Sequence, residues 1–228
     1  TGAPLPVGAD TVIRVEDTRE SEGSVVIEVG QAEGANVRRA GEDIEPGARL
    51  LEAGAVIDTV ALGVLASVGV AEPACARRPR VALLSTGDEL VGVGEELPPG
   101  GVRNSNSYAL PGLVTAVGGE VVNNDRVGDD PEATREAVAT ALAESDVLVV
   151  CGGVSVGPHD HVKGAFAACG VEEVFWRVSL KPGKPTYFGV APEGGLVFGL
   201  PGNPVSAFVT FLLFVRPALL AVQGADPA

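Results

Sequence analysis

The chain has 228 residues and a formal net charge of −14, and 46% of its residues are hydrophobic but only 4% aromatic. So acidic a chain lacks the extended basic surface that broad binding to nucleic acid or to anionic membranes requires, which argues against both partners. The length suits one large or two medium domains with a sizeable core.

The cysteines are Cys75, Cys151 and Cys169, an odd number without metal-ligand spacing, so we expect reduced thiols in a cytoplasmic protein. The two histidines are separated by one residue and no CxxC motif is present, which does not favour zinc. We expect neither a signal peptide nor a membrane span. No apolar run approaches about 20 residues, and Arg216 and Pro217 interrupt the longest candidate.

Short β-branched runs and glycines characterise residues 1–60. Thr11–Val15 and Ser24–Val29 are typical of strands, with a turn at Glu20–Gly23 between them. A helical pattern follows over Thr59–Val70. The segment Pro73–Pro79, which contains two prolines, separates this β-rich region from the rest of the chain.

From residue 80 onward, short apolar segments alternate with helical patterns of about 10 to 15 residues. The predicted strands are Arg80–Leu84, Glu120–Asn123, Asp146–Val150, Glu173–Leu180, Thr186–Val190 and Leu196–Gly199. The predicted helices are Asn106–Val117, 131–144, His159–Cys169 and 204–222. We therefore predict an α/β fold with a doubly wound, mostly parallel sheet, preceded by the smaller β-rich region.

Three glycine-rich loops, 85–89, 151–158 and 199–204, follow predicted strands. In a parallel sheet such loops meet at the carboxyl edge, where ligands bind. Glycine-rich turns before helices present backbone N–H groups to phosphate. We therefore expect one site that contains the hydroxyl, glycine, proline and asparagine residues of these loops, namely Ser85, Thr86, Gly87, Gly152, Gly153, Ser155, Gly157, Pro201, Gly202, Asn203 and Pro204.

The chain has only three lysines, and all lie in or beside glycine-rich loops. Lys181 and Lys184 bracket a Pro-Gly turn, which would let both ammonium groups converge on a phosphate or another tetrahedral oxyanion. Lys163 lies just after the 151–158 loop. The alternative is that arginine simply replaces lysine across an acidic chain and that the turn is solvated.

Loop carboxylates are candidate Mg²⁺ ligands, because one or two carboxylate oxygens suffice when phosphate supplies others. The carboxylates that fall in loops are Asp88, Glu89, Asp130 and Asp160 in the α/β part and Asp43 in the β-rich part, and Asp88-Glu89 could equally be a solvated turn. Asp130 also precedes a proline and a predicted helix, so it could serve only as a helix cap. Asp160 likewise lies near a helix start, where the helix dipole alone favours a carboxylate.

Six motifs occur in a fixed order: TGAPLPVGADTVIRVEDT (1–18), RRAGEDI (38–44), STGDEL (85–90), GGVSVGPHDHVK (152–163), LKPGKPTYFG (180–189) and GLPGNPVSA (199–207). Together they resemble the molybdopterin molybdenumtransferase family, which includes bacterial MoeA and the gephyrin E domain. The resemblance covers essentially the whole chain. It implies that residues 1–40 belong to a β-rich domain, 41–78 to an elongated linker or dimerisation domain, and 79–224 to the α/β molybdopterin-binding domain.

The resemblance also implies a reaction. Members of this family transfer molybdenum from molybdate to adenylylated molybdopterin, release AMP and use Mg²⁺. The residues of this chain that match their catalytic positions are Asp43, Glu89, Asp130, Asp160, Lys181 and Lys184. Among these acids, we assign Glu89 and Asp160 to Mg²⁺. Thr1 and Arg38 (or its neighbour Arg39) fall in matching substrate-binding motifs. At Arg103-Asn104 the chain departs from the family's usual aromatic and acidic pair, which bears on nucleotide or metal contacts.

Family members are elongated homodimers with the active site between subunits, so we expect a homodimer. The adenylyltransferase of the same pathway is a further candidate partner. Two alternatives remain open at this stage. The chain could itself be a molybdopterin adenylyltransferase-like enzyme, or it could be a non-catalytic scaffold that binds a partner peptide, as gephyrin does.

Overall fold

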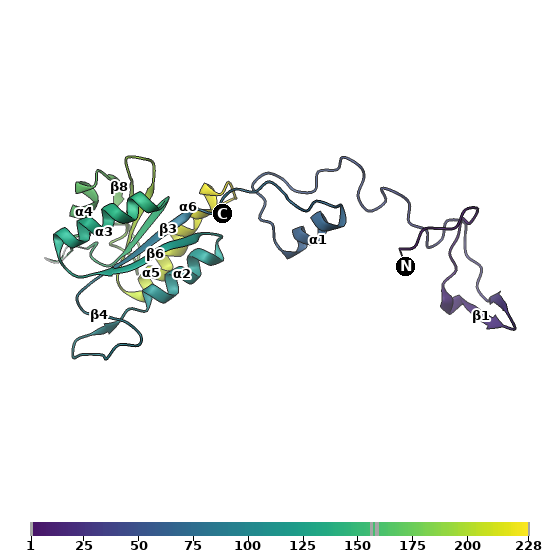
Figure 1. The fold of residues 1–228 in the computed structure, drawn as a ribbon, viewed down its shortest axis with the longest axis horizontal. Helices are drawn as coiled ribbons and strands as arrows, with labels where there is room; N and C mark the ends of the chain where they lie inside the picture. Colours follow the sequence, from purple (N-terminus) through teal and green to yellow (C-terminus); the bar gives the residue numbers. More distant parts are fainter. Residues whose placement is uncertain (1, 156, 158–159, 228) are drawn as a thin grey trace. The chain divides into compact units, whose positions relative to one another are not determined.

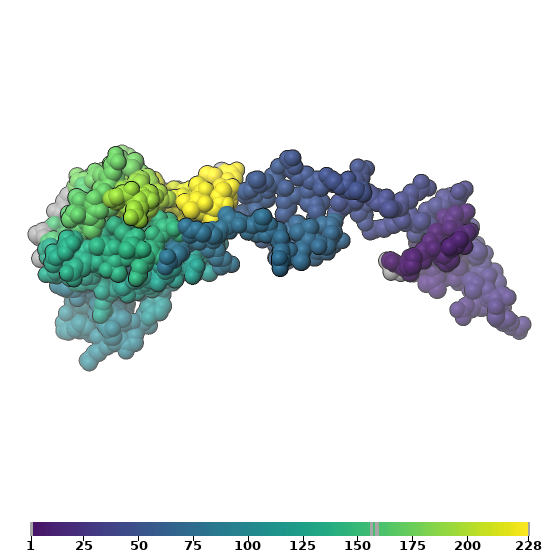
Figure 2. Space-filling model, turned by 45° about the horizontal axis from the view of Figure 1, so that its top comes forward, coloured from purple at the N-terminus to yellow at the C-terminus, as the bar shows by residue number. Residues whose placement is uncertain are grey.

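The structure is a computed structural model that describes residues 2–155, 157 and 160–227 (Figure 1). The chain divides into two compact units, residues 1–50 and 51–228. In the second unit, the residues that follow Pro79 form a closely packed body, coloured teal to yellow in Figure 2. The predicted division into three parts, with boundaries at residues 40 and 78, differs from these two units and stays a prediction.

The first unit contains one β-hairpin, in which β1 (Thr18–Ser21) pairs antiparallel with β2 (Ser24–Ile27). The connecting turn, Glu22-Gly23, has positive φ at both residues, 43° and 80°. A two-residue turn of this kind fixes the pairing register. The predicted strand at Thr11–Val15 is wrong. A 3-10 turn at Val15–Asp17 (η1) follows that segment, and the strand that pairs with β2 begins only at Thr18.

Helix α1 (Thr59–Ser67) lies near the start of the second unit, and its N-terminus is capped by a side chain. The carboxylate of Asp58 accepts a hydrogen bond from the N–H of Ala61 at 2.8 Å. Such a cap satisfies a donor that has no partner within the helix. The helix ends earlier than the predicted end at Val70, because Gly69 adopts a φ of 80°.

Six strands form the central sheet, in the order β6-β3-β7-β10-β9-β8. β6, β3, β7 and β10 are parallel, whereas β9 runs antiparallel to both of its neighbours. In that order the strands are Glu120–Val127, Arg80–Thr86, Val147–Cys151, Leu196–Leu200, Tyr187–Val190 and Glu172–Trp176. The prediction of a mostly parallel α/β sheet is confirmed.

Helices cover both faces of this sheet (Figure 1). α3 (Pro131–Glu144) and α4 (Val162–Ala168) pack on one face. α2 (Asn106–Ala116) and the C-terminal helix pack on the other. The sheet is therefore the middle of three layers, as in other α/β folds with parallel strands.

The central strands are apolar on both sides, and β3 shows why. Val81 and Leu83 point into the cluster beneath α2, whereas Ala82 and Leu84 point into the cluster beneath α3. All four are nearly inaccessible to solvent. Successive side chains of a strand point to opposite faces, so a strand covered on both faces must be continuously apolar.

The C-terminal helix is continuous but not uniform. α5 (Pro204–Thr210) passes into a π-helical segment, Phe211–Val215 (η2), and then into α6 (Arg216–Val222). Only Arg216 separates the wider π turn from Pro217, which has no N–H to donate to the preceding turn. Single π turns of this kind are common where the regular hydrogen-bond ladder is interrupted.

This helix corrects the expectation that Arg216 and Pro217 break the apolar run. Pro204–Val222 forms a single 19-residue helix that is long and apolar enough to span a membrane by length and composition alone, with a mean hydropathy of 2.1. One of its faces packs on the sheet instead. The buried side chains of that face are Ala207, Phe211, Val215 and Leu219.

Several other boundaries differ from the prediction. The strand predicted over Glu173–Leu180 ends at Trp176, because Arg177 has a φ of 68° and turns the chain out of the sheet. A small sheet of β4 (Leu90–Val91) and β5 (Val102–Arg103) is not predicted. Two-residue strands carry no periodicity, so the sequence offers no signal for them.

Candidate active site

A cleft of about 490 Å³ lies at the carboxyl ends of β3, β7 and β10. All three predicted glycine-rich loops contribute to it, which confirms that the topology brings them together. The predicted residues that line the cleft are Ser85, Thr86, Gly87, Glu89, Gly152, Gly153, Ser155, Asp160, Pro201, Gly202, Asn203 and Pro204. The lining residues not predicted there are Leu90, Val102, Asn104, Asn106, Asp129, Cys151, Val154 and Pro185.

The turn after β7 lies directly against the end of β3. Gly152 and Gly153 have φ values of 98° and 63°, a region that disfavours other residues. A Cβ atom on Gly152 would lie 2.7 Å from the carbonyl oxygen of Thr86, and one on Gly153 would lie 2.8 Å from the Thr86 hydroxyl. Only glycine fits at either position.

The Thr86 hydroxyl is the most informative atom of the cleft wall. Thr86 is 8% exposed, and its Oγ1 has no hydrogen-bond partner among the described residues. An unpaired buried hydroxyl costs about 1–3 kcal/mol. A polar group of this kind at a cleft wall is accounted for if a ligand supplies the missing partner.

Asn106, at the start of α2, ties two of the loops together. Its Nδ2 donates to the Cys151 sulfur at 3.0 Å and to the Gly202 carbonyl at 2.8 Å. The Cys151 thiol donates in turn to the Pro201 carbonyl at 3.3 Å. Burial raises the pKa of the Cys151 thiol to about 12, opposed by the hydrogen bond from Asn106, so this thiol stays protonated at neutral pH.

Asn203 serves mainly the helix that it precedes. Its side-chain oxygen accepts hydrogen bonds from the backbone N–H groups of Val205 and Ser206 at 3.0 and 3.3 Å. Pro204 occupies the first helical position. The proline loop is thus held both by a helix cap and by Asn106, and its backbone forms one wall of the cleft.

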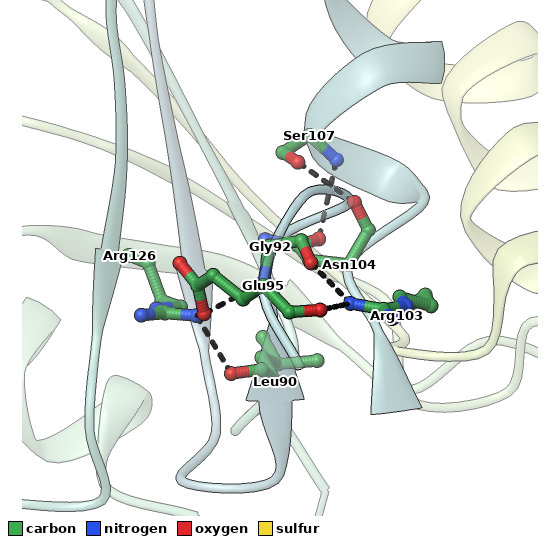
Figure 3. A network of polar contacts seen from close by, with 7 residues as sticks. All are labelled: Leu90, Gly92, Glu95, Arg103, Asn104, Ser107 and Arg126. Carbon is green, nitrogen blue, oxygen red and sulfur yellow. Dashed lines mark hydrogen bonds and ion pairs between the residues drawn. The ribbon is translucent and has the colours of Figure 1, made fainter. Parts of the chain in front are cut away.

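A second wall comes from the β4–β5 segment, which two arginines hold in place (Figure 3). Arg103 donates to the carbonyls of Gly92 and Glu95 at 2.5 and 2.6 Å. Arg126, on β6, donates to the Leu90 carbonyl at 2.7 Å and lies 3.5 Å from a carboxylate oxygen of Glu95. Arg103 therefore braces the segment and does not line the cleft.

Three carboxylates line the cleft, those of Glu89, Asp129 and Asp160. Asp130, which we predicted as a functional acid, instead caps α3 by accepting a hydrogen bond from the N–H of Ala133 at 2.7 Å. Its neighbour Asp129 lines the cleft, and the N–H of Asp129 donates to Asp88 at 3.0 Å. Sequence alone does not distinguish two adjacent aspartates, because the backbone turn between them decides which one faces the cleft.

The carboxylates fit a metal ion that is shared with a ligand. Among the described residues, no three acidic, histidine or cysteine side chains are grouped closely enough to hold a metal by themselves. Asp160 also accepts a hydrogen bond from the N–H of Gly157 within its own loop. Mg²⁺ is usually held by one or two carboxylates together with phosphate and water, so Glu89 and Asp160 suit it.

The lysines do not line the cleft. Lys163 pairs with Glu173 at 3.0 Å and lies 3.4 Å above the ring centre of Trp176. This ion pair and cation–π contact give Lys163 a structural role that the sequence did not indicate. Lys181 and Lys184 are exposed on the loop after β8, and Pro185 of the same loop lines the cleft.

Two predicted residues of the first unit contact each other. Arg38 and Asp43 form an ion pair with 2.5 Å between nitrogen and oxygen, and both side chains are largely exposed. Thr1 lies outside the described residues. The functional roles of these three residues therefore stay predictions.

Asn106, Cys151 and Asp129 are among the lining residues that were not predicted from the sequence. Each lies at an element boundary: the start of α2, the end of β7 and the turn before α3. Position at such a boundary on the carboxyl edge was the available signal. Asn106 and Asp129 are also polar, whereas Cys151 matches the apolar residues that precede it.

Two family models match the chain. The "Probable molybdopterin binding domain" matches residues 82–221, and the "MoeA N-terminal region (domain I and II)" matches residues 1–69. The chain belongs to the molybdopterin molybdenumtransferase, or MoeA, family. The resemblance stated from the motifs is confirmed.

Curated relatives carry the same name. A molybdopterin molybdenumtransferase from Haemophilus influenzae is 39% identical over 98% of this chain and 55% of its own length. One from Nostoc is 37% identical over 98% of this chain and 52% of its own. The crystal structure of a MoeA protein from Pyrococcus horikoshii matches with a TM-score of 0.78 and 34% identity, over 99% of this chain and 56% of that one. This MoeA-family chain thus spans about half the length of these relatives.

Proposed function

We propose that this chain carries the substrate-binding part of an enzyme that transfers molybdenum from molybdate to adenylylated molybdopterin and releases AMP. Its MoeA-family membership supports a role in molybdenum cofactor biosynthesis. The observation that carries the proposal furthest is the unpaired hydroxyl of Thr86 beside Gly152 and Gly153. A glycine turn and a free hydroxyl at one cleft wall suit a phosphate-bearing substrate.

The proposed division of labour follows from charge. Glu89 and Asp160 would hold Mg²⁺, which when bound neutralises phosphate charge and polarises the bond that releases AMP. These carboxylates would repel molybdate, which carries two negative charges. The exposed Lys181 and Lys184 are better suited to the oxyanion, because their charges lie on a loop that borders the cleft through Pro185.

The residues of the first unit remain part of the proposal. Asp43, Arg38 and Thr1 match functional motifs, and we propose that they act on the substrate in a homodimer. The chain spans about half the length of its relatives. Sedimentation of the chain by itself would show whether it is sufficient for dimer formation.

The test is AMP release from adenylylated molybdopterin by the 228-residue chain in Mg²⁺, with and without molybdate. Molybdate-dependent release supports the transferase, whereas consumption of ATP would support an adenylyltransferase-like enzyme. If the chain neither releases AMP nor binds adenylylated molybdopterin, the proposal is overturned and the scaffold alternative remains. Asp160→Asn keeps an oxygen that can accept from Gly157 but removes the charge, so it should abolish the magnesium dependence. Asp125→Asn, on the exposed edge of β6, is the matched control.

A further inference from the structure

Asn104 lies at the cleft wall immediately before α2, and the orientation of its side-chain amide is determined. Its Oδ1 accepts a hydrogen bond from the backbone N–H of Ser107 at 3.2 Å (Figure 3). The same oxygen lies 3.5 Å from the Ser85 hydroxyl. A backbone N–H can only donate, so the oxygen and not the nitrogen must face Ser107.

The amide nitrogen of Asn104 is therefore directed elsewhere. Asn104 is only 6% exposed, and among the described residues none accepts a hydrogen bond from its Nδ2. Thr86 lines the same cleft, and its hydroxyl has no partner either. Donors from two largely buried residues thus border one cleft. The Thr86 hydroxyl lacks the acceptor that buried polar groups normally have, and the Asn104 amide nitrogen has no acceptor among the described residues.

The surrounding charges indicate which acceptor these donors suit. Glu89, Asp129 and Asp160 line the cleft, and no lysine or arginine among the described residues does so. A phosphate in this cleft would meet negative charge unless cations or neutral donors offset it. The start of α2, an 11-residue helix, adds the positive end of a helix dipole beside Asn104.

We propose that Asn104 is a specificity-determining residue, whose Nδ2 donates with the Thr86 hydroxyl to a phosphate oxygen of the substrate. The neutral amide also limits how strongly binding depends on Mg²⁺, because a carboxylate at this position would be the fourth in the cleft. This inference rests on the proposed function, since it takes a phosphate-bearing ligand as the occupant.

The experiment is calorimetric titration of the 228-residue chain with AMP and with adenosine, each in Mg²⁺ and in EDTA. Asn104→Ala removes the donor and should weaken AMP binding about tenfold in both buffers without changing adenosine binding. Asn104→Asp keeps the acceptor for Ser107 but replaces the donor by a charge. It should weaken AMP binding about 100-fold in EDTA and less than about tenfold in Mg²⁺.

Thr140→Asp adds the same charge on the exposed side of α3 and should leave all four affinities unchanged. Thermal melting of each variant shows whether it is folded, and a purely structural role for Asn104 would not alter the magnesium dependence. Equal AMP affinities for wild type and both Asn104 variants would overturn this inference alone. Equal losses for AMP and adenosine would overturn the phosphate assignment. Absence of AMP binding by the wild type would count against the proposed function as well.

Discussion

The side-chain Nδ2 of Asn124, on β6, donates a hydrogen bond to the backbone carbonyl of Ser107 at 2.8 Å. In an uninterrupted helix that carbonyl would accept from the residue four positions later, which in α2 is Pro111. Proline has no N–H, and it is readily tolerated only in the first turn of a helix. Asn124 explains how α2 accommodates it further inside, because the sheet supplies the missing donor.

This relationship predicts energetic coupling between Asn124 and Pro111. Asn124→Ala should lower the free energy of unfolding by about 1 kcal/mol, because the Ser107 carbonyl loses its partner. In the Pro111→Ala background, the backbone N–H of residue 111 can replace that partner, so the same substitution should cost clearly less. Urea unfolding of the four proteins gives the coupling, and additive effects would contradict the explanation.

Thr86→Val should separate stability from binding. Valine has nearly the same shape but no hydroxyl, so removal of an unpaired buried oxygen should leave the free energy of unfolding unchanged or raise it by up to about 1 kcal/mol. AMP affinity should nevertheless fall about tenfold, since one donor to the phosphate is lost. Denaturant unfolding and calorimetry measure the two effects on the same samples. A loss of stability with unchanged affinity would show that the hydroxyl serves the fold.

Arg126 should control the mobility of the β4–β5 segment (Figure 3). The pKa of Glu95 is lowered by the N–H of Gly92 and then by Arg126, so the carboxylate is charged at neutral pH. Arg126→Ala should speed hydrogen exchange of the Gly92 amide several-fold, and Arg126→Lys should do so less because it keeps the charge. Unchanged exchange in the alanine variant would show that Arg103 alone holds the segment.

The three thiols should react in a fixed order with an alkylating reagent at pH 8. Cys75 is exposed and should react first. Burial raises the pKa of Cys169, so it should follow more slowly. Cys151 is buried with a pKa of about 12, so it should react only when the chain unfolds. Mass spectrometry of timed samples gives the order, and Cys75→Ser should remove only the fast phase. Early labelling of Cys151 in the native protein would contradict its burial and its hydrogen bond from Asn106.

Asp146 should make stability depend on pH at the acidic end. Arg77 donates two hydrogen bonds to this carboxylate at 2.6 and 2.7 Å, and the N–H of Arg80 donates another at 2.7 Å. These contacts lower the pKa of Asp146, chiefly through Arg77. A depressed folded-state pKa adds stability above the unfolded value of about 3.9. That stability is lost as pH falls through the folded value.

Asp146→Asn should therefore lower the free energy of unfolding by about 1–2 kcal/mol at pH 7 and by less below about pH 3. Urea unfolding of wild type and variant across this range measures the difference. Glu132→Gln, which removes the partner of Arg135 at an exposed position, controls for the general effect of a lost acid. A difference that stays constant with pH would contradict the assignment to ionised Asp146.

Local sequence determined the elements whose signals are local. Asp130 and Pro131 mark the start of α3, because a carboxylate cap and a proline at the first helical position act within four residues. The apolar run that ends at Cys151 marks β7, because a strand covered on both faces must be apolar throughout. The glycines at 152 and 153 also marked the turn that lies against Thr86.

Tertiary structure decided the rest, because it depends on groups that are distant in sequence. The N–H that Pro111 lacks is replaced across 17 residues by Asn124. Lys163 is engaged by Glu173 and Trp176, although its sequence position suggested an anion site. Asp129 faces the cleft in place of Asp130 because a backbone turn directs it there. Sequence thus determined which residue types reach the carboxyl edge, whereas packing and long-range hydrogen bonds decided which of their atoms remain available to a ligand.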